Sequence, residues 1–472
     1  MSARERRKAA LSTKLSSLDG EVADWSKLPA SNPAFTIHST QLENLCGSIA
    51  AMKKQIEDGI AELAEQRDLT YEDVIDFERQ ILAALQIWQC YRDKFAVRWL
   101  EGSRAALTLL DDLAWAAYRV TRDQAVSAKA IEALDVREPP LVFPTARWSP
   151  FARSREDAYR LEEETGTTVL VEGFDRWLDK LPIPLVGVPW YQLSHLPEGV
   201  FVGHELGHVI EGDLGLDEPL RVEIARALTG APPERLEAWS RRWRSEVFAD
   251  VYGVLTTGSA YARILLDLLA LDQEGVAGEA QPNPKRPQSQ QWGDYPTRVL
   301  RARVVCEAVR QLPSDKPNEG YFRALAAELE ASSGIPNAHA MAAYEPDVSQ
   351  VVAAMLSASL APLAGPLVDV FGFTAAMDKQ ARTDAKAANS SSAVDANDIR
   401  TLFAGVAHAF ADDPLAFTKT QAQKRFQQRM LGKRSQAPRN IETKGFVPVT
   451  SAKRQHRAAT LVLDLVKKTP GN

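Results

Sequence analysis

The stretch Gly203-His204-Glu205-Leu206-Gly207-His208-Val209-Ile210 is an H-E-x-x-H motif within an apolar run that predicts a helix. Residues four apart on a helix lie on the same face, so His204 and His208 can point their imidazoles at one metal ion. Glu205 then lies beside the open coordination position, which is the layout of a zinc hydrolase. With 7 histidines in 472 residues, this pattern rarely arises by chance. The alternative is a pair of core histidines satisfied by hydrogen bonds.

A second stretch, Ser245-Glu-Val-Phe-Ala-Asp-Val-Tyr-Gly253, offers the third protein ligand that a catalytic zinc site usually has. On a predicted helix, Glu246 and Asp250 share one face. Glu246 can ligate the metal opposite the histidine pair, while Asp250 can accept a hydrogen bond from the far ring nitrogen of a ligand histidine. The metzincin continuation is excluded, because Glu211 and Leu214 occupy its Gly and His positions. A lone E-x-x-x-D is common on solvated helix faces, so this interpretation depends on the first motif.

Together the two motifs resemble those of the gluzincin metallopeptidases, the class that combines H-E-x-x-H with a downstream Glu. The residues and spacing of the second motif are most similar to those of the membrane peptidases of the CAAX prenyl protease and HtpX type, whose second motif is E-x-x-A-D-x-x-G. Glu246, Ala249, Asp250 and Gly253 match that pattern. The resemblance covers only the part of the chain around the motifs, and it implies a zincin-like core there.

The same resemblance implies a role for each motif residue. It makes His204, His208 and Glu246 the zinc ligands, Glu205 the general base, and Asp250 the hydrogen-bond partner of the first histidine. These assignments are expectations for the structure.

A third motif of those membrane peptidases is a His-Pro with an Arg six residues after the His. In this chain Pro296 and Arg301 keep that spacing, and Tyr295 stands in place of the His. A tyrosine hydroxyl can donate a hydrogen bond to a developing oxyanion, so Tyr295 and Arg301 are candidate catalytic residues. The alternative is a plain turn before a helix. The long transmembrane helices of the family have no counterpart in the sequence.

We therefore expect a zinc metalloendopeptidase of the gluzincin type, with Zn²⁺ as its cofactor and a protein or peptide as its substrate. Glu205 takes a proton from metal-activated water and passes it to the leaving amine. A second hypothesis is an interaction protein whose zinc site is structural or catalytically idle and which binds through its helical domains and basic tail. The intact Glu205 disfavours it, because a structural site needs no base.

Cysteine usage and hydropathy suggest a compartment. Cys46, Cys90 and Cys306 are far apart and outside any C-x-x-C spacing, which fits a reducing environment. The N-terminus has no apolar core of the length of a secretory signal. The uncharged run 351–368 is interrupted by serines, prolines and a glycine, and we interpret it as a buried helix followed by a turn. We expect a soluble, cytoplasmic protein without membrane contact; the sequence leaves its oligomeric state open.

Hydrophobic periodicity predicts an α+β fold that is predominantly α-helical, with a zincin-like metallopeptidase core that contains a small sheet and is flanked by helical domains. The expected divisions are a flexible lead-in (1–37), an N-terminal helical domain (38–138), the zinc metallopeptidase core (139–315), a C-terminal helical region (316–412) and a basic tail (413–472).

Several elements around the motifs can be predicted individually. Helical spacing runs over 40–64 and from Tyr71 to about Leu134. Short β-branched runs at 167–173 and 183–190 predict strands, the second at a sheet edge because its prolines cannot donate to a ladder. A continuous helix is expected over 234–252, carrying the second motif.

The C-terminal segment is strongly basic. From residue 415 onward it holds thirteen Lys or Arg against two acids, Glu442 and Asp464, although the formal net charge of the chain is −6. Such a segment could bind nucleic acid or an acidic protein surface. No known nucleic-acid-binding module is recognisable in this segment, so a solvated tail is the favoured interpretation.

Overall fold

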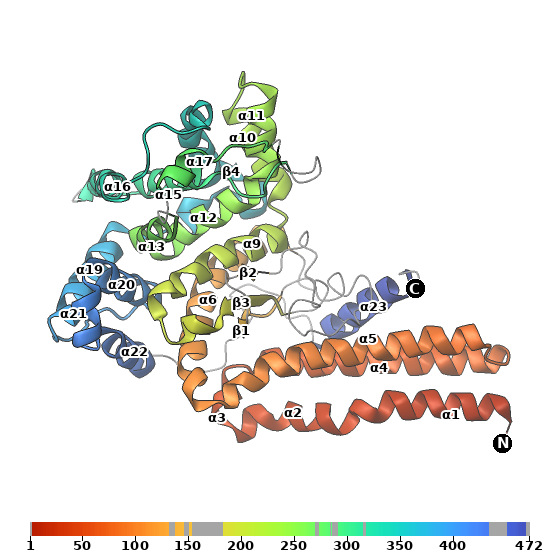
Figure 1. The fold of residues 1–472 in the computed structure, drawn as a ribbon. Coiled ribbons are helices and arrows are strands. Elements are labelled where there is room, and N and C mark those ends of the chain that lie inside the picture. Colours follow the sequence, from red (N-terminus) through yellow and green to blue (C-terminus); the bar gives the residue numbers. More distant parts are fainter. Residues whose placement is uncertain are drawn as a thin grey trace.

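The structure is a computed structural model that is predominantly helical, with a small sheet near its centre (Figure 1). It describes residues 2–131, 137–145, 151–152, 183–269, 273–283, 285, 291–314, 318–433 and 451–468. This arrangement confirms the expected α+β class with mostly α-helical content.

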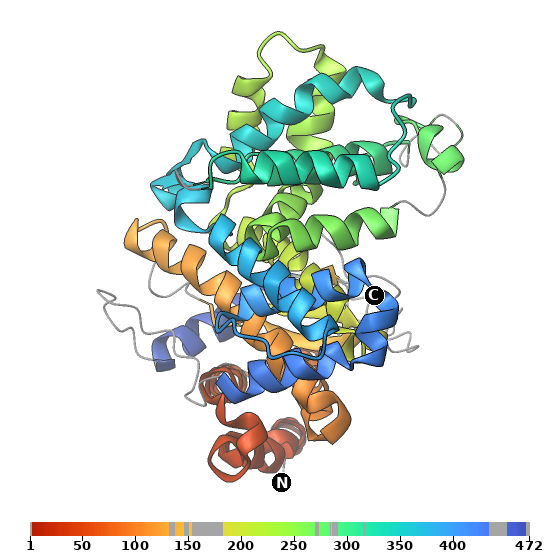
Figure 2. The same cartoon turned by 90° about the vertical axis from the view of Figure 1, so that its left-hand side faces the viewer.

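The N-terminal helices form a separate layer at one side of the molecule, below the rest in Figure 1 and nearly end-on in Figure 2. They are α1 (Ala3–Leu15), α2 (Asp19–Ser31), α3 (Pro33–Thr36), α4 (Ser39–Gln66) and α5 (Tyr71–Ala96). The helical prediction for 40–64 is confirmed by α4. The flexible lead-in expected over 1–37 is wrong, because α1 to α3 bury Leu11, Leu15 and Trp25 against α4 and α5. Pro33 is compatible with this packing because it begins α3, where its missing N–H costs nothing.

The C-terminal segment also packs as helices. Helix α23 (Ser451–Lys468) lies on α4 and buries Ala459, Val462, Leu463 and Val466 in the N-terminal core. Before it, α21 (Pro414–Lys419) and α22 (Ala422–Lys433) pack against α20 (Ile399–Asp412). The solvated tail expected over 413–472 is therefore wrong for 413–433 and 451–468, because these helices have apolar faces under their basic ones.

The sheet has the strand order β1-β3-β2, with β1 (Leu141–Thr145) parallel to β3 (Leu185–Pro189) and the short β2 (Phe151–Ala152) antiparallel to it. The edge position expected for the strand at 183–190 is thus wrong. Pro184 and Pro189 lie at the ends of β3, where they interrupt little of the ladder, and Pro144 lies on the true edge strand β1. The strand expected at 167–173 lies outside the described residues.

The sheet separates two hydrophobic cores. Side chains alternate between the faces of a strand, so neighbouring residues point to opposite sides. On β1, Val142 faces the larger core, while Leu141 and Phe143 face the N-terminal helices. On β3, Val186 faces the larger core and Leu185 the N-terminal one. The N-terminal layer therefore packs on the back of the sheet.

Helices on the other side of the sheet surround the H-E-x-x-H motif. They are α6 (Glu101–Ser127), η5 (Leu196–Phe201), α9 (Val202–Leu214), α12 (Arg244–Thr257), α13 (Ser259–Leu269) and α15 (Arg298–Arg310). Helix α9 ends at Leu214 and is capped by Gly215 in the left-handed conformation, with φ of 60°. The expected helix over 234–252 is interrupted: α11 (Pro233–Glu237) passes into a π-helical turn, η6 (Ala238–Arg242), before α12 begins.

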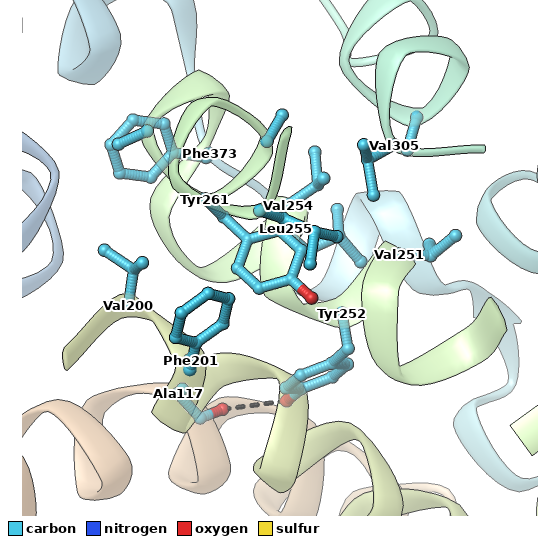
Figure 3. Close-up of a cluster of buried hydrophobic side chains, with 14 of the residues drawn as sticks. Ala117, Val200, Phe201, Val251, Tyr252, Val254, Leu255, Tyr261, Val305 and Phe373 are labelled. Atoms are coloured by element: carbon cyan, nitrogen blue, oxygen red, sulfur yellow. Dashed lines mark hydrogen bonds between the residues drawn. The ribbon is translucent and has the colours of Figure 1, made fainter. Parts of the chain in front are cut away.

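Helix α12 is buried on all sides, and Figure 3 shows part of its surroundings. Tyr261, Phe201 and Leu255 pack together there. The Tyr252 hydroxyl donates a hydrogen bond to the Ala117 carbonyl at 3.0 Å, which joins α12 to α6 (Figure 3). Close packing on every side fixes the rotation of α12, and with it the direction in which its acidic residues point.

Further helices cover the outside of this core. They are η4 (Trp190–Leu193), α10 (Asp217–Ala227), α14 (Gln273–Ala277), α16 (Tyr321–Ser332), η9 (Ala342–Asp347), α17 (Val348–Leu356), η10 (Ala361–Leu363), α18 (Leu367–Val370) and α19 (Ala375–Asn389). The short turn η1 (Ser16–Leu18) joins α1 to α2 in the N-terminal layer, and η2 (Val97–Trp99) joins α5 to α6. The run 351–368 continues α17 into a hairpin of β4 (Ser359–Leu360) and β5 (Gly365–Pro366), so the predicted helix and turn are confirmed. Among the described residues, no helix combines the length and apolarity of a membrane span.

Candidate metal centre

Glycines let the two motif helices approach each other closely. A Cβ atom at Gly207 on α9 would lie 2.6 Å from the Cα atom of Ala249 on α12. One at Gly203 would lie 2.8 Å from the Cβ atom of Thr256. Neither distance is compatible with a side chain, so the backbones touch along this line. The ligand faces of α9 and α12 are therefore brought against one another.

His204, His208 and Glu246 form a buried group with ligand atoms that all lie within 4.8 Å of one another. The Nε2 atom of His204 lies 3.4 Å from Oε2 of Glu246, and Nε2 of His208 lies 3.5 Å from Oε1. Oε2 of Glu246 is buried and has no hydrogen-bond partner among the described residues. Two imidazoles and one carboxylate, with a coordination position left open, could hold a zinc ion.

The far nitrogen of His204 contacts a buried carboxylate directly. Nδ1 of His204 lies 2.9 Å from Oδ1 of Asp250, and the Tyr261 hydroxyl donates to the same oxygen at 2.5 Å. Arg301 on α15 donates to both oxygens of Asp250, at 2.6 and 2.8 Å. Asp250 thus accepts a hydrogen bond from Nδ1–H of His204, which leaves Nε2 of His204 available to a metal.

The far nitrogen of His208 reaches a carboxylate through a hydroxyl. The Ser245 hydroxyl lies 3.0 Å from Nδ1 of His208 and donates to Oε2 of Glu211 at 2.5 Å. Arg244 donates to the other oxygen of Glu211 at 2.8 Å. Because the single hydroxyl proton is used on Glu211, Ser245 accepts from His208, whose Nε2 again stays free.

Sequence reasoning missed Tyr261 and the set Ser245, Glu211 and Arg244. A signal existed for Glu211, which is three residues after His208 and shares its helix face. Ser245 and Arg244 directly precede Glu246, at the beginning of α12. Tyr261 carried no signal, because its contact with Asp250 arises only when α13 packs against α12.

The electrostatics of the site follow from these contacts. Burial opposes protonation of His204, but its interactions with Asp250 and Glu246 outweigh burial and raise its pKa to about 9. Burial alone would raise the pKa of Asp250, but Arg301 and His204 lower it to about 2. Burial likewise opposes ionisation of Glu246, and the two imidazoles hold its pKa well below the usual range. The metal-free centre is therefore a compact cluster of opposite charges.

Glu205 follows His204 on α9, and its side chain is buried. Burial raises its pKa, an effect that the nearby histidines oppose and Glu246 reinforces. A carboxyl group with a raised pKa beside a candidate metal position is suited to accepting and returning a proton.

The structure also brings Tyr295 and Arg301 to this region. The Arg301 guanidinium lies 5.1 Å from the centroid of the Tyr295 ring. Tyr295 is 47% exposed, and the partial burial of its ring together with the charge of Glu246 raises its pKa. Arg301 is occupied by its two hydrogen bonds to Asp250, so its contacts here are those of a positioning residue.

In comparisons with known proteins, no family model, curated protein or solved structure matches this chain. The resemblance to gluzincins therefore rests on the motif residues and stays a prediction. The chemistry of the centre has to be argued from the geometry of His204, His208 and Glu246 and of the residues around them.

Proposed function

We propose that this protein is a zinc-dependent metallopeptidase of the gluzincin type that hydrolyses peptide bonds. The observation that carries the proposal is the convergence of Nε2 of His204, Nε2 of His208 and a carboxylate oxygen of Glu246 on one point. Each imidazole has its other nitrogen engaged in a hydrogen bond, so both are oriented for the same ion. Glu205 on the same helix supplies the base that a structural metal site does not need.

A zinc ion bound there supplies Lewis acidity that brings the pKa of a water molecule toward neutrality. In the proposed reaction Glu205 accepts the proton of the attacking water and delivers it to the leaving nitrogen. Tyr295 is the proposed hydrogen-bond donor to the developing oxyanion. Arg301 acts through Asp250, which holds His204 in place.

The proposal includes an intracellular setting and a protein or peptide substrate. Cys46, Cys90 and Cys306 are all free and buried, which is compatible with a reducing compartment. The preference for peptides over other amides comes from the motif resemblance. The zincin-like character of the core is likewise part of the proposal.

The test measures zinc content and cleavage of a randomised peptide library for wild type and Glu205→Gln. We expect one zinc per chain in both proteins and a loss of activity of at least about a hundredfold in the variant, because general-base catalysis is removed. A matched control is Glu198→Gln in η5, a partly exposed carboxylate that should leave zinc and activity unchanged.

Two results would overturn the proposal. One is an active Glu205→Gln variant. The other is a wild type that holds zinc but cleaves nothing in the library, which would favour an interaction protein with an idle zinc site.

A further inference from the structure

A cavity of about 600 Å³ lies between α14 and the beginning of α15. Its lining comes almost entirely from the segments 275–283 and 291–298. The volume is in the range that accommodates a drug-sized ligand or a short peptide segment. Nothing in the proposed chemistry of the metal centre has used this space.

The wall of the cavity is connected to residues next to the metal centre. The Gln281 side chain accepts a hydrogen bond from Nε1 of Trp243 at 2.9 Å and donates one to the Tyr295 carbonyl at 2.7 Å. Trp243 directly precedes α12, which carries Glu246. Tyr295 lines the cavity itself, and its ring lies over Arg301. The cavity thus adjoins the metal centre at Tyr295.

The lining combines small residues with a few polar side chains. Glycines bring backbone groups to the wall, and side-chain amides add polar groups to it, of which the Gln281 amide already bonds to Trp243 and to the Tyr295 carbonyl. The contributing residues are Gly275, Gly278 and Gly293 for the glycines and Gln281, Asn283 and Gln291 for the amides. Such a wall suits an extended peptide backbone better than a large apolar side chain.

One ion pair carries the side-chain charge of the cavity wall. Glu279 accepts from Nε of Arg298 at 2.6 Å and from the backbone N–H of Arg298 at 2.9 Å. The two side chains are each about one-third exposed, at 32% and 34%. Because they neutralise each other, the described residues of the cavity wall present no net charge to a ligand.

We propose that this cavity is a substrate subsite that receives an extended peptide segment beside the scissile bond, and that Glu279 and Arg298 determine its charge preference. The inference rests on the proposed peptidase function. With the ion pair intact, the subsite favours small and uncharged polar side chains. Removing either charge leaves the other exposed to the substrate, with opposite consequences for specificity.

The test compares cleavage-site preferences in a randomised octapeptide library for wild type, Glu279→Gln and Arg298→Gln. Glu279→Gln leaves Arg298 unpaired, so we expect kcat/KM to rise about tenfold for sites with Asp or Glu at one position. Arg298→Gln leaves Glu279 unpaired, so the gain should be for Lys or Arg at the same position. A loss of stability alone would not produce preferences of opposite sign.

The matched controls are Glu345→Gln and Arg303→Gln. Arg303 is also on α15 and pairs with Glu345 at 2.9 Å with similar exposure, but neither residue lines the cavity. These variants should keep the wild-type preference. A second test fills the space: Ala280→Trp, from an exposed lining position, should lower kcat/KM about tenfold, whereas Ala376→Trp on α19 should not.

The outcomes separate the two proposals. A wild type that cleaves no peptide overturns the peptidase function and this inference with it. A wild type that cleaves peptides, with the same rate and preference in Glu279→Gln, Arg298→Gln and Ala280→Trp, overturns only the subsite.

Discussion

The two ligand histidines of the metal centre are held in place by different hydrogen-bond arrangements. Behind His204, Asp250 touches the imidazole directly and is held by Arg301 from another helix. Behind His208, the carboxylate is one hydroxyl further away, and both that carboxylate and its arginine come from the motif helices α9 and α12 themselves. Each side therefore places an arginine–carboxylate pair behind a histidine.

The difference shows where the centre is most sensitive. Asp250 is fully buried, so its charge depends on Arg301 and His204. Ser245 is only partly buried, so water can replace its hydroxyl. We infer that the residues behind His204 contribute more to metal binding and to stability than those behind His208. Four predictions test this difference.

The largest effect is expected for Arg301→Ala. It leaves Asp250 buried without its bidentate partner, which should lower the free energy of unfolding by about 3–5 kcal/mol. Urea denaturation of the metal-free protein measures this. Arg303→Ala on the same helix removes a partly exposed pair and should cost at most about 1 kcal/mol. Equal costs for the two variants would contradict the role assigned to the Asp250–Arg301 pair.

Asp250→Asn should weaken zinc binding by about 10–100-fold, because the partner of the His204 Nδ1 proton loses its charge. Competition with a chelator of known affinity measures the change. Asp378→Asn, at a buried carboxylate that contacts Ser259 instead of a ligand histidine, is the control for loss of a buried charge. If both variants bind zinc with equal affinity, the direct contact between Asp250 and His204 does not determine the zinc affinity.

Zinc affinity should rise with pH. Without metal, His204 keeps its proton up to a pKa of about 9, above the value of about 6.5 for an unperturbed histidine. Zinc needs the neutral ring, so affinity should increase by up to about tenfold per pH unit for each proton displaced, until pH 9. In the metal-free protein, the charged ring stabilises the fold fully below pH 6.5, and this contribution is lost as pH rises through 9. A zinc affinity that stays constant between pH 6.5 and 8.5 would contradict the raised pKa.

Ser245→Ala should have the smallest effect, less than about tenfold on zinc affinity, because water can take over the hydroxyl contact to His208. Ser240→Ala, whose hydroxyl bonds only to the Leu236 carbonyl, should leave the affinity unchanged. A loss in Ser245→Ala as large as that in Asp250→Asn would show that the two sides of the centre are equivalent.

The ligand set was predictable because helical periodicity links sequence to geometry within each motif. His204 with His208, and Glu246 with Asp250, are pairs four residues apart, and their shared faces follow from the sequence alone. The sequence alone did not show that the two helix faces meet; that expectation came from the resemblance to gluzincins. The ligand atoms of His204, His208 and Glu246 do lie within 4.8 Å of one another.

The errors in the fold have a common cause. The lead-in and the basic tail were predicted to be loosely held segments, but local composition does not show whether the apolar face of a segment is covered by another element. Leu11 and Trp25 are buried because α4 and α5 are there to cover them, and Val462 is buried because α23 returns to α4. Burial of this kind depends on residues that are distant in the sequence.

The sequence by itself determined the two ligand helices, the residues that each presents on one face, and the predominantly helical class. Tertiary structure alone decided which further residues hold Asp250 and His208 in place, since Tyr261, Arg301 and Glu211 reach their partners only once α13, α15 and α9 have packed around α12. The physical reason is range: the helical repeat fixes contacts four residues apart, whereas contacts between helices depend on the packing of the whole core.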